Sequence, residues 1–282
     1  MTGHATTRNG AGAAGRYDLV VVGAGHAGCE AALAAARMGC STALVTLRAD
    51  AVARMSCNPA VGGLAKGHLV REIDALGGSM ARIADACGIQ FRLLNRSRGP
   101  AVRGPRAQQD KRLYHETMLA EIRSTAGLTL VEGEVSGLLV DQGRLYGVEV
   151  AGLGELAARR VVLTTGTVLG GLLHTGPRRT RGGRVGEPPS DALASSLRGL
   201  GFRMGRFKTG TPPRLARDSV DLSRFELQPG DERPTFFSES TAAARLPQLP
   251  CHIAYTNSRV HETILDNLDR SPLFNGTIRV RG

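Results

Sequence analysis

The strongest chemical signal in the sequence is a glycine turn suited to a phosphate-containing cofactor. Gly23, Gly25 and Gly28 form a GxGxxG pattern directly after an apolar run, residues 17–22, that is typical of a buried parallel strand. A predicted alanine-rich helix follows, and its free N–H groups and positive dipole would face the phosphates. The glycines permit a tight turn, a close backbone approach to a pyrophosphate, and close helix packing. The turn is therefore predicted to bind a dinucleotide through Gly23, Ala24, Gly25, His26, Ala27 and Gly28.

The flanking sequence favours FAD over a nicotinamide cofactor. The acidic residue that usually ends the second strand and binds a ribose hydroxyl is missing, because Thr46 stands there and Asp50 comes only later. A predicted hairpin over residues 135–150 and the run Val-Val-Leu-Thr-Thr-Gly at 161–166 are typical of FAD-binding two-domain reductases. The expected fold is α/β, with a Rossmann-like FAD-binding domain of the glutathione-reductase type and part of an inserted second domain.

Cys57 is the candidate catalytic residue. It lies in the segment Met-Ser-Cys-Asn-Pro-Ala-Val-Gly-Gly, residues 55–63, before a predicted helix that starts near Gly67. The positive end of a helix favours the thiolate, which is the nucleophilic form of cysteine, and Lys66 and His68 could assist. From the residues alone, a buried structural cysteine before a turn explains the pattern equally well.

The other titratable residues give weaker signals. His68, Asp74 and Asp85 are acid–base candidates, but solvated positions on a helix face explain them better. The remaining histidines considered are spaced too irregularly for a metal site (His174, His252 and His261). The five cysteines include no CxxC pair, so neither a metal site nor a disulfide framework is expected.

Charge points to a polyanionic partner. The chain has 282 residues and a formal net charge of +11, which favours nucleic acid above other partners. Basic groups at 92–112, 178–184 and 208–214 are candidate phosphate-facing surfaces, although solvent exposure explains most individual arginines better. Aromatic residues make up only 4% of the chain, which argues against binding by base stacking.

Targeting signals are missing from the sequence. No apolar run approaches the roughly 20 residues that span a bilayer, and the N-terminus lacks the apolar centre of a signal peptide. Together with cysteines that suggest no disulfide framework, this predicts a cytoplasmic protein with no membrane partner.

Hydrophobic periodicity outlines the predicted elements. Helices are expected over 29–38, 67–86 with a possible break at Gly77-Gly78, 108–123, 190–200 and 258–268, and strands over 41–46, 128–131, 135–140, 145–150 and, fully buried, 161–163. Pro, Arg and Thr dominate after residue 200. We therefore expect a disordered tail over 1–16, the N-terminal part of the FAD-binding domain over 17–200, and a truncated NAD- or substrate-side inserted domain over 201–282.

Many further segments match one known family. They are Gly23–Gly28, Ser56–Gly63, Lys66–Val70, Asp74–Gly78, Gly88–Arg92, Gly99–Arg103, Gly182–Arg184, Pro188–Ser190, Lys208–Arg214, Thr256–Asn257 and Asn267–Pro272. From about residue 17 to its end, the sequence closely resembles the GidA/MnmG family of FAD-dependent tRNA uridine 5-carboxymethylaminomethyl modification enzymes.

The resemblance implies a reaction and its components. Such enzymes act with the GTPase MnmE on the wobble uridine of tRNA, with FAD as cofactor, NADH as reductant and methylene-tetrahydrofolate as one-carbon donor. It also implies FAD contacts at Val135 and Ser190, a catalytic role for Cys57, and a homodimer for full-length members. Since full-length members continue well beyond Gly282, we expect a fragment or a truncated product.

Two other classes of function stay open at this point. One is a catalytically inactive flavin- or nucleic-acid-binding fragment, and the other is a different FAD or NAD oxidoreductase. The segments Ser56–Pro59 and Lys208–Arg214 argue against the second.

Overall fold

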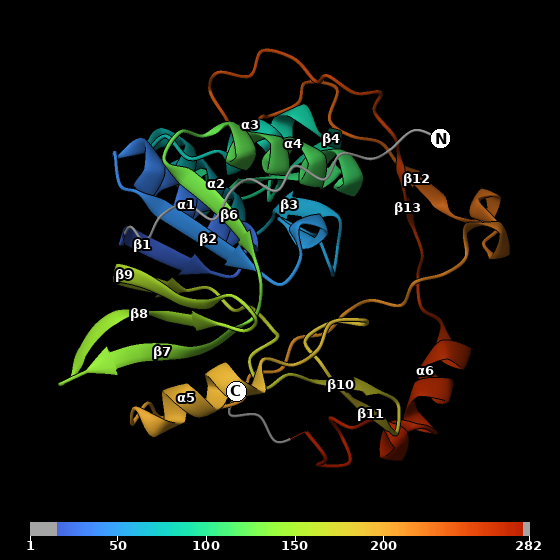
Figure 1. Cartoon of the computed structure of the whole chain (residues 1–282). Helices are drawn as coiled ribbons and strands as arrows, with labels where there is room; N and C mark the ends of the chain where they lie inside the picture. The colour runs from blue at the N-terminus through green and yellow to red at the C-terminus, as the bar shows by residue number, and fades with distance from the viewer. Residues whose placement is uncertain (1–15, 279–282) are drawn as a thin grey trace, which may run out of the picture.

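A six-stranded sheet forms the centre of the fold (Figure 1). The computed structural model describes residues 16–278, so the expected disordered tail lies outside the described residues apart from Arg16. The strand order is β6-β2-β1-β9-β8-β7. The strands are β1 (Tyr17–Val22), β2 (Thr42–Thr46), β6 (Leu128–Glu132), β7 (Val135–Asp141), β8 (Arg144–Val150) and β9 (Gly154–Leu163). β6, β2, β1 and the end of β9 run parallel, whereas β7, β8 and the start of β9 form an antiparallel meander.

Both faces of β1 and β2 are covered, which explains their continuous apolar sequences. Val21 and Leu44 pack into one core with α1 (His26–Arg37) and α4 (Lys111–Ser124). Val20 and its neighbours pack into a second core with the meander and α5 (Asp191–Gly199). The predicted strands at 17–22, 41–46 and 128–131 are confirmed within one residue at each end.

The meander confirms the predicted hairpin. Gln142 and Gly143 both adopt positive φ, 46° and 75°, as a two-residue turn between right-twisted strands requires. The fully buried strand predicted at 161–163 is wrong in its burial, because Val162 is 37% exposed. The physical reason is that β8 pairs only with Gly154–Ala157, so the end of β9 has β1 alone as its neighbour.

Two helix predictions are refined by the structure. The predicted helix over 67–86 is broken into α2 (Lys66–Ala75) and α3 (Met80–Ala86), with Gly77 at φ 85° between them. The helix predicted from residue 108 begins only at Lys111. Asp110 is its N-cap and accepts hydrogen bonds from the amides of Arg112 and Leu113, each at 3.0 Å.

A second, three-stranded sheet was not predicted. It is antiparallel in the order β3-β5-β4 and consists of β3 (Ala60–Gly62), β4 (Gly88–Leu94) and β5 (Gly104–Gln109). Its strands are short or rich in glycine and glutamine, so they lack a clear period of two. β3 of this sheet ends at Gly62 and α2 begins at Lys66, so the two elements fix the chain on both sides of residues 63–65.

Regular structure becomes sparse after residue 170. The elements there are two small hairpins, β10 (Leu172–Thr175) with β11 (Arg178–Arg181) and β12 (Glu226–Gln228) with β13 (Cys251–Ile253), the helix α5, and α6 (Ser258–Leu265). The helix predicted over 258–268 is therefore shorter, because a 3-10 turn at Leu268–Arg270 replaces its end.

Residues 226–253 return to the first part of the chain. The buried Asp85 carboxylate accepts hydrogen bonds from the amides of Phe237 at 3.0 Å and Ser238 at 2.8 Å. Asp231 accepts from the amide of Leu93 at 2.7 Å. The solvated helix-face role expected for Asp85 is therefore wrong, since this carboxylate anchors a distant segment. The expected boundary at residue 200 stays a prediction.

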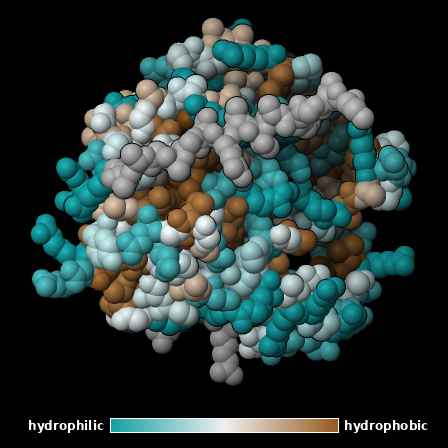
Figure 2. All heavy atoms as spheres, viewed as in Figure 1, coloured by the Kyte–Doolittle hydropathy of each residue, from teal (hydrophilic) through white to brown (hydrophobic). Residues whose placement is uncertain are grey.

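Large apolar side chains remain exposed in the later part of the chain. Examples are Phe207, Tyr255 and Phe274. Figure 2 shows brown apolar patches between hydrophilic residues on one face of the molecule. Across residues 16–278, no helix has the length and apolar character that crossing a bilayer requires.

Phe237 tests whether residues 226–253 belong to the main core. Its side chain is 1% exposed, and replacement by alanine should lower the free energy of unfolding by roughly 3–5 kcal/mol, because a buried cavity forms. Urea unfolding followed by circular dichroism measures this. The matched control is Phe207→Ala, at a side chain 97% exposed, which should change stability by less than about 0.5 kcal/mol. Equal stability of the two variants would contradict the packing described.

Candidate functional site

A pocket lies at the carboxyl ends of the parallel strands. β1, β2, β6 and β9 end at the same edge of the sheet, which is where ligands bind in open α/β folds. The cavity measures about 110 Å³. Of the predicted cofactor-binding residues, the structure brings Gly23, Ala24, Gly25, Val135 and Ser190 together in its lining. His26, Ala27, Gly28 and Cys57 do not line it.

The three motif glycines differ in their surroundings. Gly23 has φ 100°, and a Cβ there would lie 2.5 Å from the Thr164 carbonyl oxygen. A Cβ on Gly28 would overlap the Gly23 carbonyl oxygen. Gly25 is different, because nothing lies within 4 Å of its Cβ position. Gly23 and Gly28 therefore meet packing constraints within the protein, whereas Gly25 leaves open space beside the pocket.

The N-terminus of α1 offers unpaired amide groups. Gly25 is the N-cap, with no capping side chain, and the first turn holds no acidic residue. A helix of 12 residues presents a partial positive charge at this end. His26, the first helical residue, turns its ring to Tyr114 instead, edge to face with centroids 5.4 Å apart. The ring of His26 therefore packs inside the protein and does not line the pocket.

The opposite wall of the pocket is a segment that motif analysis noted but did not assign as a site. The Thr164 hydroxyl donates to the carbonyl oxygens of Val22 at 2.9 Å and Gly23 at 2.7 Å, which ties the end of β9 to the glycine turn. The lining residues missed by the site prediction are Val22, Val45, Thr46, Leu47, Arg48, Ala51, Gly133, Thr164, Thr165, Gly166, Thr167, Val168, Arg184, Glu187 and Leu193. The available signal was the Thr-Thr-Gly that follows a strand at 161–163.

The residues that line the pocket fit a dinucleotide. The end of β2, however, has no carboxylate that could bind the ribose. Thr46, Leu47 and Arg48 line the pocket at that point. Ser190, at the N-cap of α5, is buried, and its side chain makes no capping bond to the helix. Its hydroxyl is therefore not committed to capping. The pocket combines backbone donors, hydroxyl groups and open space beside Gly25, which are the groups that a diphosphate and sugar require.

Cys57 lies apart from this pocket, against a second motif segment. Its thiol donates to the Gly210 carbonyl oxygen at 3.4 Å, and an Arg214 guanidinium nitrogen donates to the Cys57 carbonyl oxygen at 2.6 Å. The structure thus brings the Ser-Cys-Asn-Pro and Lys-Thr-Gly-Thr-Pro-Pro-Arg segments together across more than 150 residues. Among residues 16–278, no hydrogen bond or ion pair joins Lys66 or His68 to Cys57, and β3 separates Cys57 from α2.

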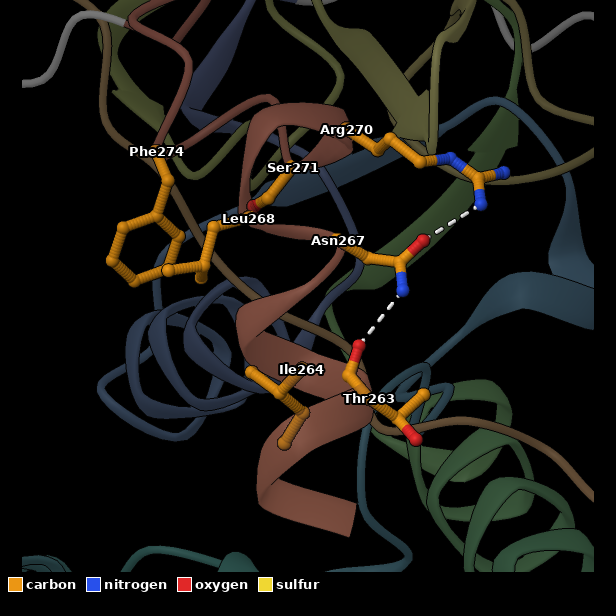
Figure 3. Close-up of a pocket in the computed structure, with 7 residues that line it drawn as sticks. All are labelled: Thr263, Ile264, Asn267, Leu268, Arg270, Ser271 and Phe274. Carbon is orange, nitrogen blue, oxygen red and sulfur yellow. Dashed lines mark hydrogen bonds between the residues drawn. The ribbon is translucent and has the colours of Figure 1, made fainter. Parts of the chain in front are cut away.

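A larger depression of about 540 Å³ lies beside α6 (Figure 3). In it the Asn267 side chain donates to the Thr263 carbonyl oxygen at 2.8 Å and accepts from Arg270 at 2.8 Å. None of its lining residues is a predicted site residue. Within the described range 16–278, no three His, Cys, Asp or Glu side chains gather in a way that could hold a metal ion.

Comparison with known proteins places this geometry in a family. Residues 18–282 match the family described as Glucose inhibited division protein A, or GidA. The chain belongs to the GidA family. It is 56% identical over 263 residues to the tRNA uridine 5-carboxymethylaminomethyl modification enzyme MnmG of Geobacter sulfurreducens, with 93% of this chain and 42% of the relative covered. The MnmG of Geobacter metallireducens is 56% identical over 264 residues, with the same coverage.

A solved structure of the family shares the fold. Aquifex aeolicus GidA, in its form I crystal, superposes with a TM-score of 0.88 at 45% identity, covering 95% of this chain and 46% of that chain. The Rossmann-like FAD-binding fold predicted from the sequence is thereby confirmed. The chain spans about two-fifths of the length of the curated relatives it matches, 42% in each of the two cases above.

Thiol labelling tests the surroundings of the cysteines in this GidA-family chain. Burial raises the pKa of Cys29 to about 12, and burial also raises the pKa of Cys87, so both thiols should stay protonated and unreactive at pH 8. Cys57 is only partly buried, where it contacts an exposed loop, and we expect it to be alkylated before Cys29 and Cys87. Peptide mass mapping after iodoacetamide treatment, with and without urea, measures the order. Labelling of Cys29 before Cys57 in the native chain would contradict the structure.

Proposed function

We propose that this chain is the flavin-binding part of an enzyme that adds a carboxymethylaminomethyl group to C5 of the tRNA wobble uridine. The observation that carries the proposal is the pocket formed by the glycine turn and the Thr164–Val168 wall, in a chain whose relatives are called tRNA uridine 5-carboxymethylaminomethyl modification enzymes. Bound FAD would supply two-electron redox chemistry to this reaction.

The residues that would hold FAD follow from the pocket. The amides at the start of α1 would bind the diphosphate, and the open space at Gly25 would admit it. Val135 and Ser190 would contact the rest of the cofactor from the meander and the N-cap of α5. Gly23 and Gly28 would shape the turn, and His26 and Ala27 would contribute backbone only, since neither lines the cavity.

Cys57 would be the catalytic thiol, with a covalent or redox role. Its segment is held by the 208–214 loop, which supplies a hydrogen-bond acceptor to the thiol and a guanidinium to the backbone. Lys208 and Arg214 are both exposed on that loop, so they are available for contacts with tRNA phosphates. Arg214 thus brings a positive charge next to Cys57, which favours chemistry on a polyanionic substrate.

The remaining components of the proposal rest on the family resemblance. They are tRNA as substrate, the GTPase MnmE as partner, NADH as reductant, methylene-tetrahydrofolate as one-carbon donor, and a homodimer of the longer protein. The net charge of +11 supports a nucleic-acid substrate. We also propose residues 17–200 as the FAD-binding domain and 201–282 as part of the inserted NAD- or substrate-side domain. A cytoplasmic location would keep the five cysteines reduced.

Flavin retention tests the pocket directly. Gly25→Val adds a side chain that meets no protein atom within 4 Å at its Cβ but enters the proposed diphosphate space. We expect FAD affinity to fall at least about 100-fold while the fold is kept, since the phosphate–amide bonds are lost. Flavin fluorescence titration measures this. The matched control is Gly205→Val, where a Cβ also has open space but which does not line the pocket. Unchanged FAD affinity in Gly25→Val would refute the cofactor site.

Cys57→Ser tests the catalytic proposal. Residues 17–282 replace the matching segment of the 56%-identical Geobacter sulfurreducens relative, and wobble-uridine modification is measured by nucleoside mass spectrometry. Cys57→Ser should keep FAD and lose activity by about 100-fold or more, as expected for a removed catalytic group. Cys29→Ser and Cys87→Ser, at buried cysteines, are the controls and should lose far less. Wild-type activity in Cys57→Ser would make the residue structural.

A further inference from the structure

Arg184 lines the proposed cofactor pocket and carries a buried hydrogen-bond donor without a partner. That donor is the Nε–H of its guanidinium. A guanidinium N–H withdrawn from water without a partner costs free energy, so an acceptor supplied by a bound ligand would stabilise it. In the sequence, Arg184 is the last residue of the basic group 178–184, one of the candidate phosphate-facing surfaces.

The loop that carries Arg184 is tightly fixed. A Cβ on Gly183 would overlap Val168, and a Cβ on Gly182 would lie 2.5 Å from the Glu187 carbonyl oxygen. The Thr167 hydroxyl donates to the Gly183 carbonyl oxygen at 2.9 Å. The 182–187 loop is therefore packed against the Thr164–Val168 wall, and the position of the Arg184 backbone is built into the pocket.

A carboxylate holds the guanidinium from one side. Glu187 Oε1 lies 3.5 Å from Arg184 Nη1 and 3.9 Å from Arg54 Nη1, and the Glu187 side chain is 9% exposed. Two arginines thus share one buried carboxylate, which leaves the cluster with a net positive charge. The contact between Glu187 and Nη1 is an ion pair without a hydrogen bond, so Glu187 Oε1 and Arg184 Nε both lack a hydrogen-bond partner in this arrangement.

The pKa of His26 shows that the charge of Arg184 reaches the start of α1. Burial, and after it the charge of Arg184, lower the pKa of His26, so its ring is neutral at pH 7. His26 is the first residue of α1, and its Nδ1 is buried without a partner. The Arg184 charge therefore acts at the start of α1, where the helix N-terminus already favours an anion.

We propose that Arg184 binds the diphosphate of the dinucleotide through its guanidinium, together with the amides of the α1 N-terminus, and that the ion pair with Glu187 positions that guanidinium. The inference rests on the proposed function and adds a side chain to a site otherwise made of backbone donors. The pocket has no ribose-binding carboxylate at the end of β2. A cation that contacts the diphosphate would supply binding free energy in place of that ribose contact.

Binding of ADP and adenosine to the whole chain separates the possible roles. ADP carries the diphosphate, and adenosine lacks it. Arg184→Met should weaken ADP binding about 10- to 100-fold, the loss expected for one charge-assisted hydrogen bond, and leave adenosine binding within about twofold. Calorimetry measures ADP, and saturation-transfer NMR measures the weaker adenosine. Arg181→Met is the matched control, because Arg181 pairs with Asp191 outside the pocket lining and should change neither ligand.

Further variants keep the inference falsifiable. Arg184→Lys retains the positive charge but loses the guanidinium N–H groups, so it should weaken ADP binding by a smaller factor than Arg184→Met. It provides the test if Arg184→Met does not fold. Wild-type ADP affinity in both variants, or equal losses for ADP and adenosine, would overturn the role of Arg184 and leave the proposed function intact. Failure of the wild-type chain to bind either FAD or ADP would instead overturn the proposed cofactor site, and this inference with it.

Discussion

The contact between the glycine turn and the end of β9 is the constraint on which the site depends. Gly28 has no room for a Cβ because the Gly23 carbonyl oxygen lies against it, and the Thr164 hydroxyl donates to that same oxygen. Three separate segments therefore meet within hydrogen-bond distance: the end of β1, the first turn of α1 and the end of β9. Any larger residue at Gly28 would force the helix away from the strand and open the pocket on one side.

The same junction lies between the two hydrophobic cores, and residues from both contribute to the pocket. β1 and β2 send alternate side chains to opposite faces, one toward α1 and α4 and the other toward the meander and α5. The helix N-terminus comes from the first layer, whereas Val135 and Ser190 come from the second. The pocket therefore forms only when both layers are packed on the same parallel strands.

The Cys57 segment depends on a different set of long-range contacts. Residues 226–253 are anchored to α3 and β4 by Asp85 and Asp231, and the 208–214 loop that precedes them reaches Cys57. Burial raises the pKa of Asp85 even though two amides donate to its carboxylate. This group alone therefore favours folding below its unfolded pKa, and that contribution is lost as pH rises through the higher folded value.

Local sequence determined the elements whose signal is contained in a few neighbouring residues. The strand before Gly23, the turn itself, the hairpin at Gln142-Gly143 and the break at Gly77 all follow from short-range backbone preferences, and the structure has each of them. The motif residues by themselves also identify the family. The strands β3–β5 escaped prediction because their pairing, and not their periodicity, creates them.

Tertiary structure alone decided which residues share the pocket and which do not. Thr164 meets the glycine turn only because β9 lies beside β1, a pairing across about 140 residues that no local pattern encodes. Arg184 lines the same pocket because its loop packs against Thr167 and Val168. The same holds for Asp85, whose helical position suggested solvent until the amides of Phe237 and Ser238 covered it. Contacts between distant segments depend on how complete layers pack, so the sequence identified the chemical groups and the fold determined their partners.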